Sequence, residues 1–157
     1  MTALLKKYDL PTPRYTSYPT LPYWQKEAPQ ADRWLTEVKR QFDQNRAMSL
    51  YIHMPFCEQL CTYCACNKRI TKRHSVEKPY MDALLHEWAI YRTAMKGQPL
   101  LEELHLGGGT PTFFSPENLR ELLSWIVDTS SIAPQHNFSF EAHSGSSNVR
   151  IAYSLGV

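Results

Sequence analysis

The chain places a predicted strand directly before a cluster of cysteines in residues 49–66, SLYIHMPFCEQLCTYCAC. Ser49 to Met54 has the pattern of a strand, and Pro55 ends it because proline has no N–H for a strand ladder. All four cysteines of the chain lie between Cys57 and Cys66. Thiols that served only as small core residues would not be expected to gather so closely. The strand therefore leads into a loop that carries chemistry.

Strand, loop and helix then repeat along the chain. Apolar residues from Tyr80 to Met95 recur at helical spacing, and Pro79 stands near the first turn, where its missing N–H does no harm. A second strand, Leu101 to Leu106, runs into three glycines. The last predicted elements are a helix that Ser115 and Pro116 start, with an apolar face from Leu119 to Ile126, and a strand over Asn137 to Ala142.

This alternation predicts an α/β fold with a parallel sheet and right-handed crossovers. In such folds the functional loops lie at the carboxyl ends of the strands. The cysteines and the glycines Gly107 to Gly109 each follow a strand, and Glu141 stands near the end of the third. We therefore expect these three features to meet at one edge of the sheet.

The residues before this core have a different pattern. Five prolines between residues 8 and 30 favour an extended segment, and Leu35, Val38 and Phe42 predict a short helix after it. We assign residues 1–47 to this segment and its helix, and residues 48–157 to the core domain.

Composition excludes several classes of protein. Of the 157 residues, 43% are hydrophobic and 20% are charged, which is typical of soluble globular chains and not of disordered, collagen-like or membrane-spanning ones. The net charge is +2 with no basic block, so we expect neither a nucleic-acid nor a membrane partner. The first twenty residues carry no apolar stretch long enough for a secretory signal. We expect a cytoplasmic location, where reduced cysteines more often bind metal or do chemistry.

The cysteines are separated by three, two and one residues. Structural zinc sites usually join two ligand pairs that are a dozen or more residues apart, whereas one short loop of thiolates suits an iron–sulfur cluster. Three thiolates on a [4Fe–4S] cluster would leave one iron open to another ligand. The cluster is the favoured interpretation. Zinc completed by His53 or His74, and unligated core thiols, are the alternatives.

The other candidates also allow two interpretations each. Gly107 to Gly109 let the backbone approach a ligand where a Cβ would collide, or else they simply form a tight turn. The Glu141 carboxylate is either an acceptor for a ribose or an amine, or a solvated charge. His53 is either a packing histidine or a polar group beside a cofactor.

The cysteine spacing, Cys57-x3-Cys61-x-Tyr63-Cys64, resembles the signature of the radical S-adenosylmethionine superfamily. Further features resemble its oxygen-independent coproporphyrinogen III oxidase family, from about residue 8 to Glu141. These features are YIHMPFC at 51–57, the extra Cys66, GGGTP at 107–111 and PRYTSYP at 13–19. The resemblance implies the N-terminal part of a parallel (β/α) partial TIM-type barrel, preceded by the extended proline-rich segment.

The resemblance also implies a set of site residues. Cys57, Cys61 and Cys64 would hold a [4Fe–4S] cluster whose fourth iron binds the amine and carboxylate of S-adenosyl-L-methionine, and Cys66 would not be a ligand. The positions that match the family's cofactor contacts are Tyr51, Tyr63, Gly108, Gly109, Thr110 and Glu141. Arg14 is our candidate for the substrate carboxylates, because guanidinium pairs with them bidentately; the alternative is an ordinary surface arginine.

The implied reaction is reductive cleavage of S-adenosylmethionine to a 5′-deoxyadenosyl radical. This radical starts the decarboxylation of two propionates, which converts coproporphyrinogen III to protoporphyrinogen IX in haem biosynthesis. An electron donor is required, and the sequence does not identify it. The alternatives are a related radical enzyme or chaperone that handles haem, although the chaperone branch generally lacks Cys66 and the 13–19 motif, and, in a different class, a zinc-binding interaction module.

The chain is short for this fold. It supplies about three of the roughly six to eight βα units that such a sheet needs to curl or close, and it departs from the family pattern after Glu141. We therefore expect a truncated chain that does not turn over coproporphyrinogen by itself.

Overall fold

A parallel sheet of three strands organises the part of the chain that the computed structural model describes, which is residues 7, 23–24, 30–62 and 64–142. The strands are β1 (Ala47–Met54), β4 (Leu100–Gly108) and β5 (Ser131–Phe140), in the order β1-β4-β5. Both neighbouring pairs are parallel. The sheet confirms the predicted α/β class.

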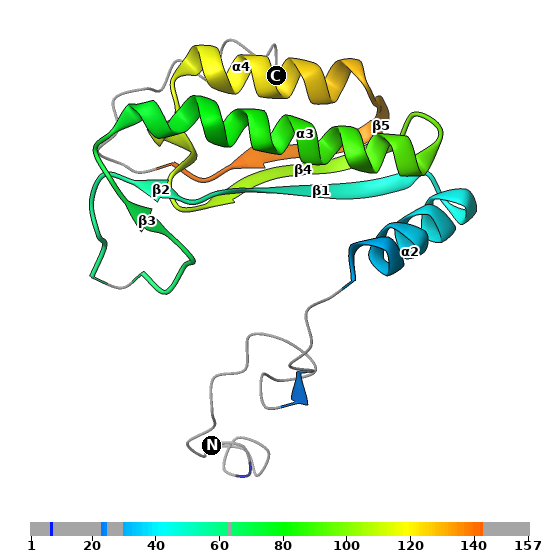
Figure 1. Ribbon diagram of the computed structural model, residues 1–157, viewed down its shortest axis with the longest axis horizontal. Coiled ribbons are helices and arrows are strands. Elements are labelled where there is room, and N and C mark those ends of the chain that lie inside the picture. The colour runs from blue at the N-terminus through cyan, green and yellow to red at the C-terminus, as the bar shows by residue number, and fades with distance from the viewer. Residues whose placement is uncertain (1–6, 8–22, 25–29, 63, 143–157) are drawn as a thin grey trace. The chain divides into compact units, whose positions relative to one another are not determined.

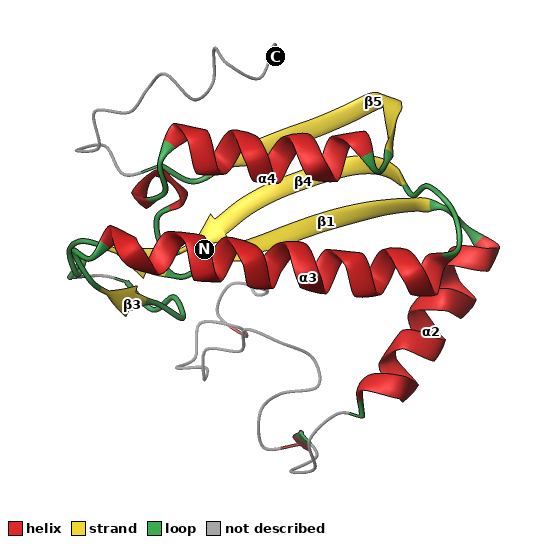
Figure 2. Ribbon diagram, turned by 45° about the horizontal axis from the view of Figure 1, so that its top comes forward, coloured by secondary structure: helices red, strands yellow, loops and turns green. Residues whose placement is uncertain are grey.

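Two helices cover the same face of this sheet. They are α3 (Glu77–Met95) and α4 (Pro116–Asp128), which lie side by side in Figures 1 and 2. A third helix, α2 (Ala31–Gln44), precedes β1 and packs against α3, where Trp34 Nε1 donates a hydrogen bond to the Tyr91 hydroxyl at 3.0 Å. None of the helices within residues 30–142 is long and apolar enough to cross a bilayer.

Shorter elements connect the strands to the helices. A second parallel pair, β2 (Phe56–Cys57) and β3 (Arg69–Ile70), flanks the cysteine loop. The 3₁₀ turns η2 (His74–Val76) and η3 (Pro111–Phe113) lead into α3 and α4. All these elements belong to one unit, Ala31–Val157, and residues 1–30 form a second one. The predicted proline-rich segment lies almost wholly outside the described residues, and the domain boundary at residue 47 stays a prediction.

The core fills the space between the sheet and its two helices. Alternate residues of β1 and β4 point to it, because side chains along a strand alternate between its faces. From α4 the predicted apolar face, Leu119 to Ile126, packs against them. The most buried members of this core are Met54, Met81, Leu101, Phe114, Leu122 and Ile126.

The strand β5 begins at Ser131, well before the predicted Asn137, so this predicted start was wrong. Leu101 of β4 pairs with Ile132, but Glu103 pairs with Asn137, so β5 carries extra residues between the two paired segments. Pro134 lies among them and has no N–H to give to the ladder. In the sequence, a proline at this position predicts a break in the strand. In the structure β5 continues through Pro134, with an irregularity in its pairing.

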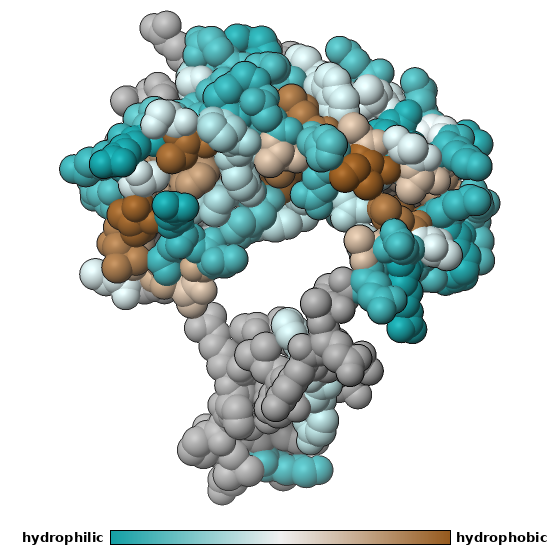
Figure 3. All heavy atoms as spheres, in the orientation of Figure 1, coloured by the Kyte–Doolittle hydropathy of each residue, from teal (hydrophilic) through white to brown (hydrophobic). Residues whose placement is uncertain are grey.

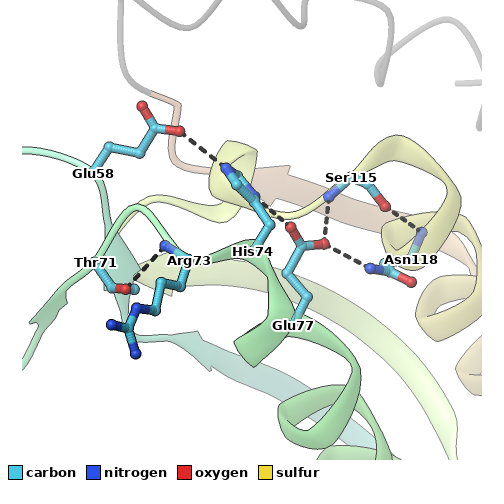
Figure 4. A network of polar contacts seen from close by, with 7 residues as sticks. All are labelled: Glu58, Thr71, Arg73, His74, Glu77, Ser115 and Asn118. Carbon is cyan, nitrogen blue, oxygen red and sulfur yellow. Dashed lines mark hydrogen bonds and ion pairs between the residues drawn. The ribbon is translucent and has the colours of Figure 1, made fainter.

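A buried carboxylate joins the starts of α3 and α4. Glu77, the first residue of α3, is 4% exposed. Its Oε2 accepts hydrogen bonds from the Ser115 backbone N–H at 2.9 Å and from Asn118 Nδ2 at 2.6 Å (Figure 4). Ser115 is the predicted N-cap of α4, and its Oγ accepts from the Asn118 N–H at 3.2 Å. Negative charge is favourable at helix N-termini, so Glu77 stabilises both helices at this end.

We expect Glu77→Gln to lower the free energy of unfolding by about 3 kcal/mol, because it removes the charge and replaces one acceptor oxygen by a donor. The measurement is urea denaturation followed by tryptophan fluorescence. Glu117→Gln is the matched control, because Glu117 is an exposed glutamate in the first turn of α4. Equal losses in the two variants would contradict the role assigned to Glu77.

Candidate cofactor site at the carboxyl edge of the sheet

The cysteine loop follows β1 at the carboxyl edge of the sheet. All four cysteines are free thiols: Cys57 is buried, Cys61 and Cys64 are half-buried, and Cys66 is exposed. Cys57 ends β2, and its Sγ accepts a hydrogen bond from Thr110 Oγ1 at 3.3 Å. The cysteine loop and the segment after the glycines are therefore in direct contact.

Local hydrogen bonds stabilise the far half of this loop. Lys68 Nζ donates to the backbone carbonyls of Cys64 and Cys66, each at 3.2 Å. The pKa of the Cys64 thiol is lowered, first by the backbone N–H of Cys66 and also by the charge of Lys68. Hydrogen bonding to Cys64 raises the pKa of the Cys66 thiol. The Cys64 and Cys66 thiols therefore interact directly within this half of the loop.

The donor set fits an iron–sulfur cluster in its chemistry, because four unpaired thiols share one loop. Among the described residues, which leave out Tyr63, no three His, Cys, Asp or Glu side chains converge closely enough to hold a metal ion. A cubic cluster does not require its thiolates to converge on one ion, because each thiolate binds a different iron.

The two histidines of the zinc alternative have other partners. His53 Nδ1 lies 3.0 Å from the Tyr51 hydroxyl, and its Nε2 lies 2.8 Å from the Asn67 carbonyl oxygen. Both nitrogens of His74 are likewise engaged, by Glu77 and Glu58. A histidine that ligates a metal must give one nitrogen to it, so this arrangement weighs against zinc.

The glycine loop passes close to the end of β1. The Gly109 N–H donates to the Met54 carbonyl at 2.8 Å, and a Cβ on Gly109 would lie only 2.7 Å from that oxygen. Gly108 has a φ of +109°, and a Cβ there would lie 2.4 Å from the ring of His53. Tight packing thus requires both glycines whether or not a ligand binds.

Glu141 is held at the same place. Its Oε2 accepts a hydrogen bond from the Gly108 N–H at 3.0 Å, and its own N–H donates to the Leu106 carbonyl at 2.9 Å. Its Oε1 lies 3.8 Å from His105 Nε2. The Glu141 side chain remains 54% exposed. This carboxylate is therefore fixed in position and still accessible.

A row of polar side chains crosses the sheet on the face away from the helices. Tyr51, His105 and Ser139 are paired in register on three neighbouring strands. The ring of Tyr51 stacks on His105 with centroids 5.8 Å apart, and His105 Nδ1 lies 2.8 Å from Ser139 Oγ. Burial, with a contribution from the charge of Glu141, raises the pKa of Tyr51. Sequence reasoning missed His105 and Ser139, although both alternate with apolar residues in their strands.

The structure brings Cys57, Gly108, Thr110 and Glu141 together at one edge, as the strand order predicted. Tyr63 and Arg14 lie outside the described residues. Apolar side chains are also exposed near the cysteine loop, as brown spheres in Figure 3 on the side where Figure 1 labels β2 and β3. Leu60 is 62% exposed there and Ile70 45%.

Two known proteins of similar sequence carry the same name. The chain is 44% identical over 123 residues to the oxygen-independent coproporphyrinogen III oxidase of Pseudomonas aeruginosa, covering 78% of this chain and 26% of that protein. It is 37% identical over 141 residues to the Escherichia coli protein of that name, covering 89% and 28%. This chain resembles part of an oxygen-independent coproporphyrinogen III oxidase. No family model matches it.

The fold agrees with this oxidase resemblance. A solved structure described as "Coproporphyrinogen III oxidase (HemN) from Escherichia coli is a Radical SAM enzyme" matches with a TM-score of 0.72 and 31% identity. The match covers 88% of this chain and 30% of that one. The chain spans only about a quarter to a third of the length of these oxidases. The resemblance predicted from the motifs is confirmed, and so is the parallel α/β fold.

We expect Gly109→Ala to destabilise the chain by about 1–3 kcal/mol, because the new Cβ meets backbone atoms of Met54 and Pro55 that have little freedom to move. Urea denaturation measures the loss, and hydrogen exchange of the Thr110 amide reports the local opening. Gly97→Ala is the control, since a Cβ there meets nothing nearer than a Phe42 ring atom at 3.4 Å. Similar losses in both variants would show that the close approach of Gly109 to β1 does not matter.

Proposed function

We propose that this chain is part of an oxygen-independent coproporphyrinogen III oxidase and that its cysteine loop holds the [4Fe–4S] cluster of a radical S-adenosylmethionine enzyme. The observation that carries the proposal is the hydrogen bond from Thr110 to Cys57, which joins the thiol loop to the glycine loop. The identity of 34–44% to curated oxidases supports the same assignment. When bound, the cluster and S-adenosylmethionine supply a one-electron reductive cleavage that starts decarboxylation of the substrate propionates.

The proposed ligands are Cys57, Cys61 and Cys64. They are the more buried thiols of the loop, and Cys57 already has a defined place on β2. Cys66 is exposed, and its proposed role is to shape or shield the loop beside the cluster. Three thiolates satisfy three irons and leave one iron for the S-adenosylmethionine amine and carboxylate.

The proposed contacts to S-adenosylmethionine lie around the glycine loop. An ammonium group donates hydrogen bonds, so it requires acceptors. The amides of Gly108, Gly109 and Thr110 are already bonded within the protein, which leaves carbonyl oxygens as the groups this segment can offer. The accessible Glu141 carboxylate adds an acceptor for an amine or a ribose hydroxyl. Tyr51 and Tyr63 complete the proposed set, and the Tyr51 side chain is 54% exposed on the uncovered face of the sheet.

The proposed substrate is coproporphyrinogen III, and the radical chemistry also requires an electron donor. A porphyrinogen with four carboxylates needs cationic partners, and Arg14 is the proposed one. In a complete relative, alanine at the position that matches Arg14 is expected to raise the KM for coproporphyrinogen. Cleavage of S-adenosylmethionine without substrate is expected to stay unchanged. An unchanged KM would remove Arg14 from the site.

Anaerobic reconstitution with iron and sulfide tests the ligand set in this chain. We expect the unaltered chain to become brown and to bind iron and sulfide in equal amounts. Cys57→Ser, Cys61→Ser and Cys64→Ser should each lose most of the visible absorption, because two thiolates hold a cubic cluster poorly. Cys66→Ser is the matched control and should keep it.

The outcomes separate the competing functions. Loss in Cys66→Ser equal to that in the other three variants would overturn the ligand assignment. A colourless chain that takes up zinc in place of iron would favour the zinc module. Reductant and S-adenosylmethionine are then added to the reconstituted chain, and methionine and 5′-deoxyadenosine are measured. A protein that holds the cluster but lacks radical chemistry would release neither product.

A further inference from the structure

One histidine connects the base of the cysteine loop to the helical layer (Figure 4). Glu58 directly follows Cys57, and its Oε1 lies 3.2 Å from His74 Nε2. On the other side of the ring, His74 Nδ1 lies 2.6 Å from Oε1 of the buried Glu77. Because Glu77 also accepts hydrogen bonds from the start of α4, the contacts run without a break from the loop to both helices.

The ring of His74 is held in orientation as well as in position. It stacks on Phe113 with centroids 4.6 Å apart and an angle of 13° between the planes, and Phe113 is buried. A neutral imidazole donates from one nitrogen only, so hydrogen bonds to two carboxylates require the imidazolium form. The pKa of His74 is accordingly raised, chiefly by the hydrogen bond to Glu77 and further by Glu58.

Cys57 is the most buried thiol of the loop. It is 7% exposed, its carbonyl accepts from the Thr71 N–H at 2.9 Å, and its Sγ accepts from Thr110. Cys61 and Cys64 are less buried. Cys57 is therefore the thiol of this loop whose place is defined by contacts with other segments.

We propose that His74 is a positioning residue that bridges Glu58 to Glu77 and so holds Cys57 in place beside Thr110. That the bridge serves a cluster rests on the proposed function. The contacts themselves are present in the chain without any metal. The side chains of Glu58 and His74 are 52% and 53% exposed, so solvent screens the outer half of the bridge. Its effect on Cys57 is modest and local.

The test measures how fast iodoacetamide alkylates Cys57 in the metal-free chain, by mass spectrometry of the peptides and relative to the exposed Cys66. Glu58→Ala and His74→Asn should each raise the relative rate by about two- to fivefold, as expected for a screened ion pair. The double variant should add nothing further, because both changes remove the same bridge. Glu58→Gln keeps an acceptor oxygen and should restore much of the protection.

Glu102→Ala is the matched control, since Glu102 is an exposed glutamate on β4. It should leave the Cys57 rate unchanged. Thermal unfolding of every variant shows whether a faster rate reflects global destabilisation. An unchanged rate in Glu58→Ala, or additive effects in the double variant, would overturn the bridge. So would a faster rate that only follows the loss of global stability.

Cluster loading separates this inference from the proposed function. The bridge acts on the cluster as proposed if two comparisons hold. The reconstituted cluster should lose iron to a chelator faster in Glu58→Ala than in the unaltered chain, and more slowly in Glu58→Gln than in Glu58→Ala. If the unaltered chain takes up no cluster while Cys57 still depends on Glu58 and His74, the proposed function fails and the positioning role stands. If all variants load and hold the cluster equally and the Cys57 rate does not change, the positioning role fails alone.

Discussion

The backbone of Gly109 lies directly against the end of β1, and the candidate site is built around this contact. The Gly109 N–H reaches the Met54 carbonyl at 2.8 Å, a distance that a Cβ on Gly109 would prevent. The strands β1 and β4 are parallel and end side by side. The loop after β1 therefore starts next to the loop after β4. The Thr110 N–H then bonds to the Phe56 carbonyl at 3.0 Å, and its hydroxyl to Cys57. The thiol loop and the glycine loop therefore keep their relation without any ligand.

Two glutamates at this end of the sheet have different tasks because their burial differs. Glu77 is 4% exposed and accepts two hydrogen bonds from the start of α4, so it stabilises the scaffold and is closed to a ligand. Glu141 holds one glycine amide and is otherwise open on the uncovered side. The same separation applies to the whole sheet, in which one face is packed under helices and the other carries Tyr51, His105 and Ser139. The packed core and this polar row thus lie on opposite sides of the strands.

Local patterns in the sequence determined the class of the fold and the place of the site. Apolar spacing predicted α3 and α4, and the Ser115 N-cap with the following proline located the start of α4. The alternation of strands and helices predicted a parallel sheet, and parallel strands bring their carboxyl ends to one edge. Motif spacing predicted a resemblance to part of the oxidases, which the similar sequences confirm. The cluster ligands and cofactor contacts stay predictions, because neither the structure nor the relatives test their roles.

Only the tertiary structure decided which distant residues meet. Glu77 and Ser115 are 38 positions apart, and no local pattern relates a helix's first glutamate to the cap of the next helix. His105 faces Tyr51 and Ser139 because of strand register, which depends on packing of whole strands and not on any one of them. The start of β5 at Ser131 likewise depends on pairing with Leu100 across an irregularity at Pro134. Sequence thus determined the elements through short-range periodicity, whereas long-range pairing determined the contacts that hold Cys57 and Glu141 in place.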